Sequence, residues 1–159
     1  MTEITLTVNG TIKTLEVEER RLLADVLRHD FGCYGVHFGC SHGVCGCCTV
    51  HVEGEPRLSC LTFAVQCDGL QIKTIEGMAG PDGLHPLQKA FMAEHGLQCG
   101  YCTPGFIMAL APFVARSGNP TDAEIREAMS GNLCRCTGYD GIVAAVKRAI
   151  AERGLRADD

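Results

Sequence analysis

The sequence lacks the features that would mark a membrane-spanning or nucleic-acid-binding chain. It has no tryptophan and only 6% aromatic residues. No apolar stretch approaches the roughly 18 residues that a transmembrane helix requires. The formal net charge is −5, without a basic run and without basic residues interleaved with aromatic ones. We therefore expect no transmembrane segment and no nucleic-acid partner, and we expect the partners to be proteins.

The N-terminus also lacks a secretory signal. Residues 1–6 are acidic and alternating where a signal peptide would have a basic segment and an apolar run. Arg20-Arg21 superficially suggests a twin-arginine signal, but no long apolar stretch follows it. We therefore expect a cytoplasmic protein, in which thiols stay reduced and clustered cysteines are more often metal ligands than disulfides.

Cysteine is what the sequence has in excess, with 11 in 159 residues. A disulfide framework, a zinc protein and an iron–sulfur protein would each explain such a number. The chain has room for two small domains of about 75 residues each, a size at which a hydrophobic core needs additional stabilisation. A metal centre supplies it, because its binding free energy becomes folding free energy.

The first half of the sequence predicts strands and one helix. Apolar residues alternate on both sides of Asn9-Gly10, which indicates a β-hairpin over residues 4–17. Three further elements are expected in this half: a helix at 22–27 and strands at 49–53 and 70–75.

The second half predicts an all-helical domain after a glycine- and proline-rich linker. Four helices are expected, at 84–95, 104–116, 121–131 and 141–153. Thr103 is the expected N-cap of the second, Thr121 and Glu124 form a capping-box pattern for the third, and Gly154 is the expected end of the fourth. The expected domains are 1–76 (β-grasp), 77–83 (linker) and 84–159 (all-α), so the fold class is α+β.

The first group of candidate ligands has the C-x4-C-x2-C spacing of plant-type [2Fe–2S] proteins, with a fourth cysteine further on. We call it the first set: Cys40, Cys45, Cys48 and Cys60. Gly39, Gly43 and Gly46 interleave with it and allow backbone N–H groups to approach sulfur. The alternative is a zinc site on Cys45-x2-Cys48, which needs a matching second pair that the sequence does not supply.

The second group combines two close pairs of cysteines that lie far apart in the sequence. We call it the second set: Cys99, Cys102, Cys134 and Cys136. A helix is expected to start directly after the first pair, at Thr103-Pro104, and another soon after the second, at Tyr139-Asp140. Helix N-termini stabilise an anionic cluster through their free N–H groups and dipoles. The pattern favours a second [2Fe–2S] cluster, with zinc or a redox-active dithiol as the alternatives.

Three motifs carry a resemblance to a known family. They are residues 39–50 around the first three cysteines, residues 98–105 (QCGYCTPG) and residues 131–139 (GNLCRCTGY). With these motifs in this order, the chain resembles the small subunit of the xanthine dehydrogenase, aldehyde oxidoreductase and aerobic carbon monoxide dehydrogenase family of molybdenum hydroxylases. The resemblance implies a ferredoxin-like β-grasp domain followed by a four-helix-bundle domain, each with one [2Fe–2S] cluster.

The resemblance also implies an electron-transfer function without substrate chemistry on this chain. The first set would lie toward a medium FAD-binding subunit, and the second against a large subunit that binds molybdopterin, as its cytosine dinucleotide. Gln98 would hydrogen-bond the pterin, and Cys136 would lie at the pterin end of the relay. The implied assembly is a dimer of heterotrimers.

Three cysteines are not assigned as ligands, and several functions remain open. Cys47 stands where the family usually has a small apolar residue, and Cys33 and Cys67 match no ligand position. The alternatives are a free-standing two-cluster ferredoxin, a redox sensor, and the small subunit of a reductive relative that dehydroxylates an aromatic acyl-CoA. The motifs do not distinguish the substrate or the direction of electron flow.

Overall fold

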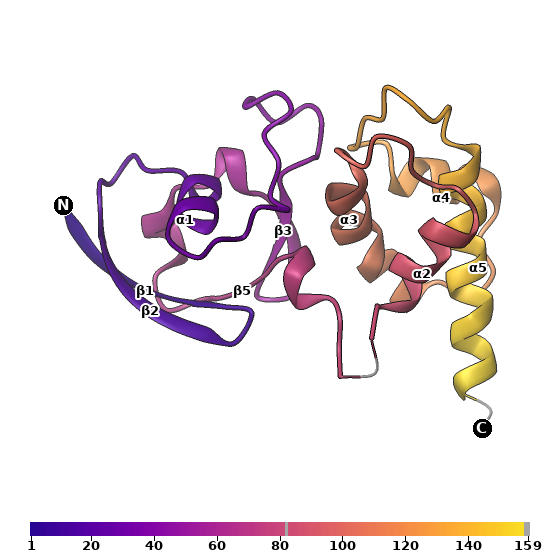
Figure 1. Cartoon of the computed structure of the whole chain (residues 1–159), viewed down its shortest axis with the longest axis horizontal. Coiled ribbons are helices and arrows are strands. Elements are labelled where there is room, and N and C mark those ends of the chain that lie inside the picture. The colour runs from indigo at the N-terminus through magenta and orange to yellow at the C-terminus, as the bar shows by residue number, and fades with distance from the viewer. Residues whose placement is uncertain (82, 158–159) are drawn as a thin grey trace.

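The hairpin predicted around Asn9-Gly10 opens the computed structural model, which describes residues 1–81 and 83–157 (Figure 1). Strands β1 (Thr2–Val8) and β2 (Thr11–Val17) pair antiparallel, with Val8 opposite Thr11. Asn9 and Gly10 have φ angles of 50° and 83°. Positive φ at both central residues is what a type I′ turn requires, so the local sequence determines this register.

The hairpin belongs to a five-stranded mixed sheet with the order β2-β1-β5-β3-β4. Its other strands are β3 (Thr49–Val52), β4 (Glu55–Leu58) and β5 (Gln71–Lys73). Strand β1 pairs parallel with β5, whereas the other neighbouring strands of this sheet pair antiparallel. Helix α1 (Leu23–His29) buries its apolar residues in the same core. Strand β4 was not predicted, because it contains Pro56 and two charged residues; its position at the sheet edge tolerates the missing N–H of proline.

The second half contains the four predicted helices. They are α2 (Pro86–Ala93), α3 (Thr103–Arg116), α4 (Asp122–Ala128) and α5 (Asp140–Ala157). Their boundaries differ from the predicted ones by up to four residues: α2 is two residues shorter at each end than predicted, and α4 ends at Ala128 instead of near 131. Two differences concern residues that the sequence singled out. The N-cap of α3 is Cys102 instead of Thr103. Helix α5 continues through Gly154, where the sequence predicted its end, since one glycine costs a helix only about 1 kcal/mol.

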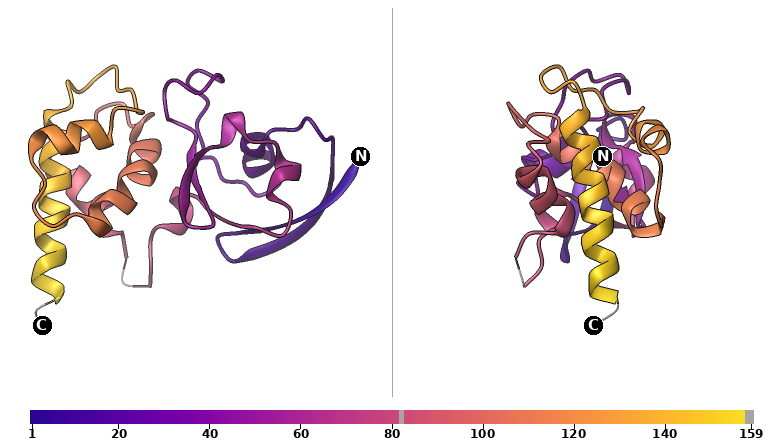
Figure 2. Two further views of the ribbon diagram at one scale, coloured as in Figure 1. Left: turned by 180° about the vertical axis from the view of Figure 1, so that it is seen from behind. Right: turned by 90° about the vertical axis from the view of Figure 1, so that its right-hand side faces the viewer.

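Each half has its own hydrophobic core, and the two lie side by side along the long axis of the molecule (Figure 2). The first core lies between the sheet and α1, and the second lies among α2, α3, α4 and α5. Short 3-10 helices fill the connections: η1 (Ser59–Leu61), η2 (Ala64–Cys67) and η3 (Ile75–Gly77). Ile75 and Met78 precede residue 84, yet both pack on the second core. The domain boundaries at 76 and 84 therefore stay a prediction.

Helix α4 begins with the capping box that the sequence predicts. The Glu124 N–H donates to Thr121 Oγ1 at 3.3 Å, and the Thr121 N–H donates to Glu124 Oε2 at 2.7 Å. We expect Thr121→Ala to lower the free energy of unfolding by about 1 kcal/mol, because it leaves a helix N–H without its partner. Thermal unfolding checks this, with Thr121→Ser as the control that keeps the hydroxyl. An equal loss in the serine variant would contradict the capping role.

Within the two ranges that the structure describes, no helix is both long enough and apolar enough to cross a membrane.

Candidate metal centres

The first set of cysteines lies where the loop after α1 enters the sheet. Cys40 and Cys45 are half-buried in the loop, whereas Cys48, just before β3, and Cys60, in η1, are buried. The thiols are close in pairs, Cys40 with Cys45 and Cys48 with Cys60. The N–H and the hydroxyl of Ser59 both donate to the Cys48 carbonyl, at 3.3 and 2.7 Å, which fixes η1 against the loop.

Backbone donors converge on the outer thiol pair of the first set. The N–H groups of Val44 and Cys45 each lie 3.3 Å from Cys40 Sγ. Hydrogen bonds from the backbone of His42 and then of Cys45 lower the pKa of the Cys40 thiol to about 6. Burial instead raises the pKa of the Cys48 thiol to about 11. The loop is therefore arranged to stabilise negative charge on sulfur at its outer end.

Two of the three glycines in this loop have the unusual backbone angles that the sequence suggested. Gly43 and Gly46 have φ angles of 85° and 70°. Gly39 does not have a positive φ angle. A Cβ at this position would lie 2.8 Å from Cys45 Sγ, so the missing side chain of Gly39 leaves room for the sulfur atom of Cys45.

The second set comes from two loops that the helices bring together. The Sγ atoms of Cys99 and Cys136 are 3.6 Å apart, and the thiols of Cys102 and Cys134 form the other close pair. A cavity of about 390 Å³ is lined by all four cysteines. Helix α3 begins directly after Cys102, and α5 begins four residues after Cys136, as the sequence predicts.

Charge on the second set is controlled by burial and by nearby donors. Burial raises the pKa of the Cys102 thiol to about 12. Burial acts the same way at Cys134, but the hydroxyl of Thr137, 3.1 Å from Cys134 Sγ, and the backbone N–H groups of Cys136 and Thr137 outweigh it and lower the pKa. Cys99 and Cys136 are exposed, so this pair faces outward.

The pairing of the thiols fits a two-iron cluster in each set. A [2Fe–2S] core has two irons, each of which takes two cysteine thiolates. Across residues 1–81 and 83–157, no three His, Cys, Asp or Glu side chains converge as ligands of a single ion. The eight thiols are close in four pairs, and the thiol of Cys47, which is not assigned as a ligand, is also close to that of Cys45. The hydroxyl of Thr103, beside Cys102, is buried without a hydrogen-bond partner among the described residues. An anionic cluster on the second set would offer the acceptor that it lacks.

The two loops that carry the sets touch each other. The Leu133 N–H donates to the Cys45 carbonyl at 2.9 Å, and Asn132 Nδ2 donates to the Gly46 carbonyl at 3.1 Å. In Figure 1 these loops lie along one edge of the molecule, where its two halves meet. Asn132 and Leu133 lie in one of the three family motifs, but the sequence alone predicts no contact for either residue.

Further contacts hold the halves together near the sets. His51 on β3 is buried, and its Nε2 lies 2.6 Å from the carbonyl of Met108 on α3. A carbonyl can only accept, so this nitrogen carries the proton. Tyr101, next to Cys102, stacks on His37 at 4.4 Å and donates its hydroxyl to the Phe38 carbonyl at 2.8 Å. None of these roles was predicted, because they depend on residues distant in sequence.

The remaining predicted site residues lie in different surroundings. Gln98 is exposed beside Cys99. Cys33 and Cys67 are buried in the first core. Cys47 is buried, with 5% of its surface exposed, and lines the same cavity as the second set.

We expect Cys47→Ala to keep both clusters, because alanine fills nearly the same buried space and removes no assigned ligand. The purified protein should retain about four irons per chain. Cys45→Ala is the matched control and should lose iron. Loss of iron from Cys47→Ala alone would contradict the assignment of the first set.

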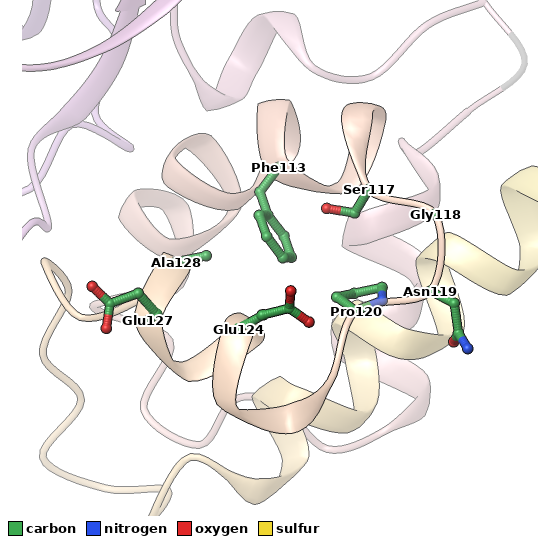
Figure 3. Close-up of a pocket in the computed structure, with 8 residues that line it drawn as sticks. All are labelled: Phe113, Ser117, Gly118, Asn119, Pro120, Glu124, Glu127 and Ala128. Atoms are coloured by element: carbon green, nitrogen blue, oxygen red, sulfur yellow. The ribbon is translucent and has the colours of Figure 1, made fainter.

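A cavity of about 510 Å³ lies away from both sets. Phe113 of α3 and Pro120 and Glu124 at the start of α4 line it, together with the connecting segment (Figure 3). It contains no cysteine, and we assign it no part in the metal centres.

Comparison with protein families gives both halves a chemical identity. Residues 6–68 match the 2Fe-2S iron-sulfur cluster binding domain, and residues 74–147 match the [2Fe-2S] binding domain. The prediction of two [2Fe–2S] clusters is thereby confirmed at the level of domains. The assignment of individual cysteines as ligands stays a prediction.

Relatives of known function match nearly the whole chain. It is 50% identical over 147 residues to the gamma subunit of caffeine dehydrogenase from Pseudomonas sp. (strain CBB1), which covers 91% of this chain and 88% of that one. It is 49% identical over 153 residues to the small subunit of nicotine 6-hydroxylase from Paenarthrobacter nicotinovorans, with coverages of 96% and 92%.

Solved structures agree with this result. The fold superposes on a chain of quinoline 2-oxidoreductase from Pseudomonas putida 86 with a TM-score of 0.91 and 44% identity, over 99% of this chain and 98% of that one. The predicted α+β fold class is therefore confirmed.

Proposed function

This chain belongs to the family of small iron–sulfur subunits of xanthine dehydrogenase-type oxidoreductases, whose role is electron transfer, and we propose that it relays electrons between a molybdopterin subunit and an FAD subunit. The observation that carries the proposal is the arrangement of eight cysteines as four thiol pairs in two sets whose loops touch. Cys40, Cys45, Cys48 and Cys60 would hold one cluster, and Cys99, Cys102, Cys134 and Cys136 the other.

A relay through two clusters suits a two-electron oxidation. Each [2Fe–2S] cluster carries one electron at a time, so two clusters allow two electrons to leave the molybdenum site stepwise. The chain contributes thiolate ligands and backbone donors such as those at Cys40 Sγ, which tune the potential. The substrate chemistry belongs to the partner subunits.

Exposure near each set supports a partner at each end. Gln98, Cys99 and Cys136 are exposed, and Tyr101 and Leu133 beside them expose 47% and 49% of their surfaces. The second set is therefore accessible to a molybdopterin subunit, with Gln98 and Cys136 as the residues nearest the pterin.

The first set has a corresponding apolar border. Val44 in its loop and Leu61 in η1 expose 54% and 59% of their surfaces. This border is where we place the FAD subunit. The whole assembly would be a cytoplasmic dimer of heterotrimers, with molybdopterin cytosine dinucleotide in the large subunit.

Native purification tests the proposal. A tagged chain isolated from its own cells, without denaturant, should elute with two larger subunits that contain molybdenum and flavin. Anaerobic addition of the complex's substrate should then reduce the clusters. A stable monomer with both clusters and no larger partner would contradict the subunit function and favour a free-standing ferredoxin.

A further inference from the structure

A side-chain hydroxyl donates directly to one sulfur of the second set. Thr137 Oγ1 lies 3.1 Å from Cys134 Sγ. The Tyr139 N–H donates to the same hydroxyl oxygen at 3.3 Å, so the oxygen accepts one hydrogen bond and its own hydrogen is free for the sulfur. A thiolate without a proton can only accept, which fixes the direction of this hydrogen bond when Cys134 is a ligand.

The backbone that places this hydroxyl is strained. Tyr139 has a φ angle of 75°, a left-handed conformation that a bulky residue rarely adopts. Its phenol oxygen accepts the Cys134 N–H at 2.9 Å, and its ring packs edge-on against Phe106, with the ring centroids 6.1 Å apart. Strain of this kind persists only where the surroundings determine the conformation, and it is concentrated at functional sites. The turn from Cys134 to Tyr139 is therefore held in a geometry that directs the Thr137 hydroxyl at sulfur.

We propose that the Thr137 hydroxyl raises the reduction potential of the second cluster. The proposal rests on the proposed function, since it requires a [2Fe–2S] cluster on the second set. Reduction transfers one electron from a donor, which is oxidised, to the cluster, and no bond to sulfur forms or breaks. The added electron increases the negative charge on the thiolate sulfurs. Because a hydrogen bond is stronger to a more negative acceptor, the hydroxyl stabilises the reduced cluster more than the oxidised one.

The contribution of the hydroxyl can be separated from that of the backbone. The backbone N–H groups of Cys136 and Thr137 also form hydrogen bonds with the Cys134 thiol, and they remain with any non-proline side chain at position 137. Thr137→Val replaces the hydroxyl by a methyl group of similar size, so it removes the hydrogen bond without opening a space. Thr137→Ser keeps the hydroxyl and loses the methyl group. These two variants therefore distinguish the hydrogen bond from the volume of the side chain.

The test is an anaerobic redox titration of the assembled holoenzyme, followed by EPR of both clusters. In Thr137→Val we expect the ratio of reduced to oxidised second cluster to fall about tenfold at a fixed potential. For a one-electron couple this corresponds to a midpoint potential about 59 mV lower. Thr137→Ser should keep the midpoint of the unchanged protein. The first cluster is the internal control, and its midpoint should stay the same in both variants.

An unchanged midpoint of the second cluster in Thr137→Val that retains its iron would overturn the proposal. So would an equal fall in Thr137→Ser, because that variant keeps the hydroxyl. If Thr137→Val loses iron, Thr137→Ala removes the hydroxyl without adding a methyl group, and an unchanged midpoint there overturns the proposal equally. Loss of iron from both of these variants would show that the hydroxyl holds the cluster in place instead of tuning it, which also overturns the proposal.

Failure of the proposed function would look different. The second EPR signal would then be missing from the unchanged protein, or the chain would purify without its larger subunits. Neither result depends on the side chain at position 137.

Discussion

Replacing Cys134 by alanine is expected to abolish the second cluster and leave the first intact. Cys134 forms the inner thiol pair with Cys102, and the hydroxyl of Thr137 donates to its sulfur at 3.1 Å. No other cysteine of its loop is free to replace it, since Cys136 already pairs with Cys99 at 3.6 Å. Iron should fall from about four to about two per chain, and one of two rhombic EPR signals should disappear.

Cys33→Ala is the matched control for this variant. Cys33 is also a buried cysteine, but it lies in the first core and belongs to neither set. It should keep all the iron and both signals. Loss of both signals from folded Cys134→Ala protein, or full retention of iron, would contradict two separate sites.

Gly105→Ala is expected to loosen the contact between the two halves. A Cβ at this position of α3 would lie 2.3 Å from the Gly46 carbonyl oxygen and 2.8 Å from Cys47 Cα. Both atoms are backbone, so no side-chain rotation relieves the clash. Overpacking of this kind costs about 1 to 3 kcal/mol, and the higher helix propensity of alanine offsets about 1 kcal/mol of it, so we expect a net loss of up to about 2 kcal/mol.

The thermal unfolding midpoint measures this effect. A loss of 1 kcal/mol lowers the midpoint by about 2 to 4 °C in a chain of this size. Gly118→Ala is the control, because a Cβ there meets nothing within 4 Å. The Gly105 variant should also alter the EPR signal of the first set, whose loop it displaces. An unchanged midpoint and signal would show that the halves tolerate a wider separation.

Local signals allowed much of the fold to be predicted from the sequence. Asn9-Gly10 specifies a turn by its own backbone preferences, and Thr121 with Glu124 specifies a helix start by a bond between near neighbours. Strand β4 carried no such signal, because an edge strand with Pro56 depends on pairing with β3. Three cysteines of the first set, Cys40, Cys45 and Cys48, lie in one loop, so their spacing could be recognised in the sequence as a ligand motif.

Contacts between the halves could not be predicted in the same way. His51 resembles any strand histidine until α3 packs against it and Met108 accepts its hydrogen bond. Asn132 resembles a loop asparagine, although it is buried and bonded to Gly46. Both contacts depend on how the two domains pack against each other. The hydrophobic periodicity of the sequence within one domain does not predict that packing.

The most direct test of the account is the iron and sulfide content of the purified chain, measured together with EPR of the dithionite-reduced protein. Two [2Fe–2S] clusters predict about four irons and about four acid-labile sulfides per chain, with two distinct rhombic signals. Only about two irons with one signal, or stoichiometric zinc without labile sulfide, would contradict a relay built from two cysteine sets.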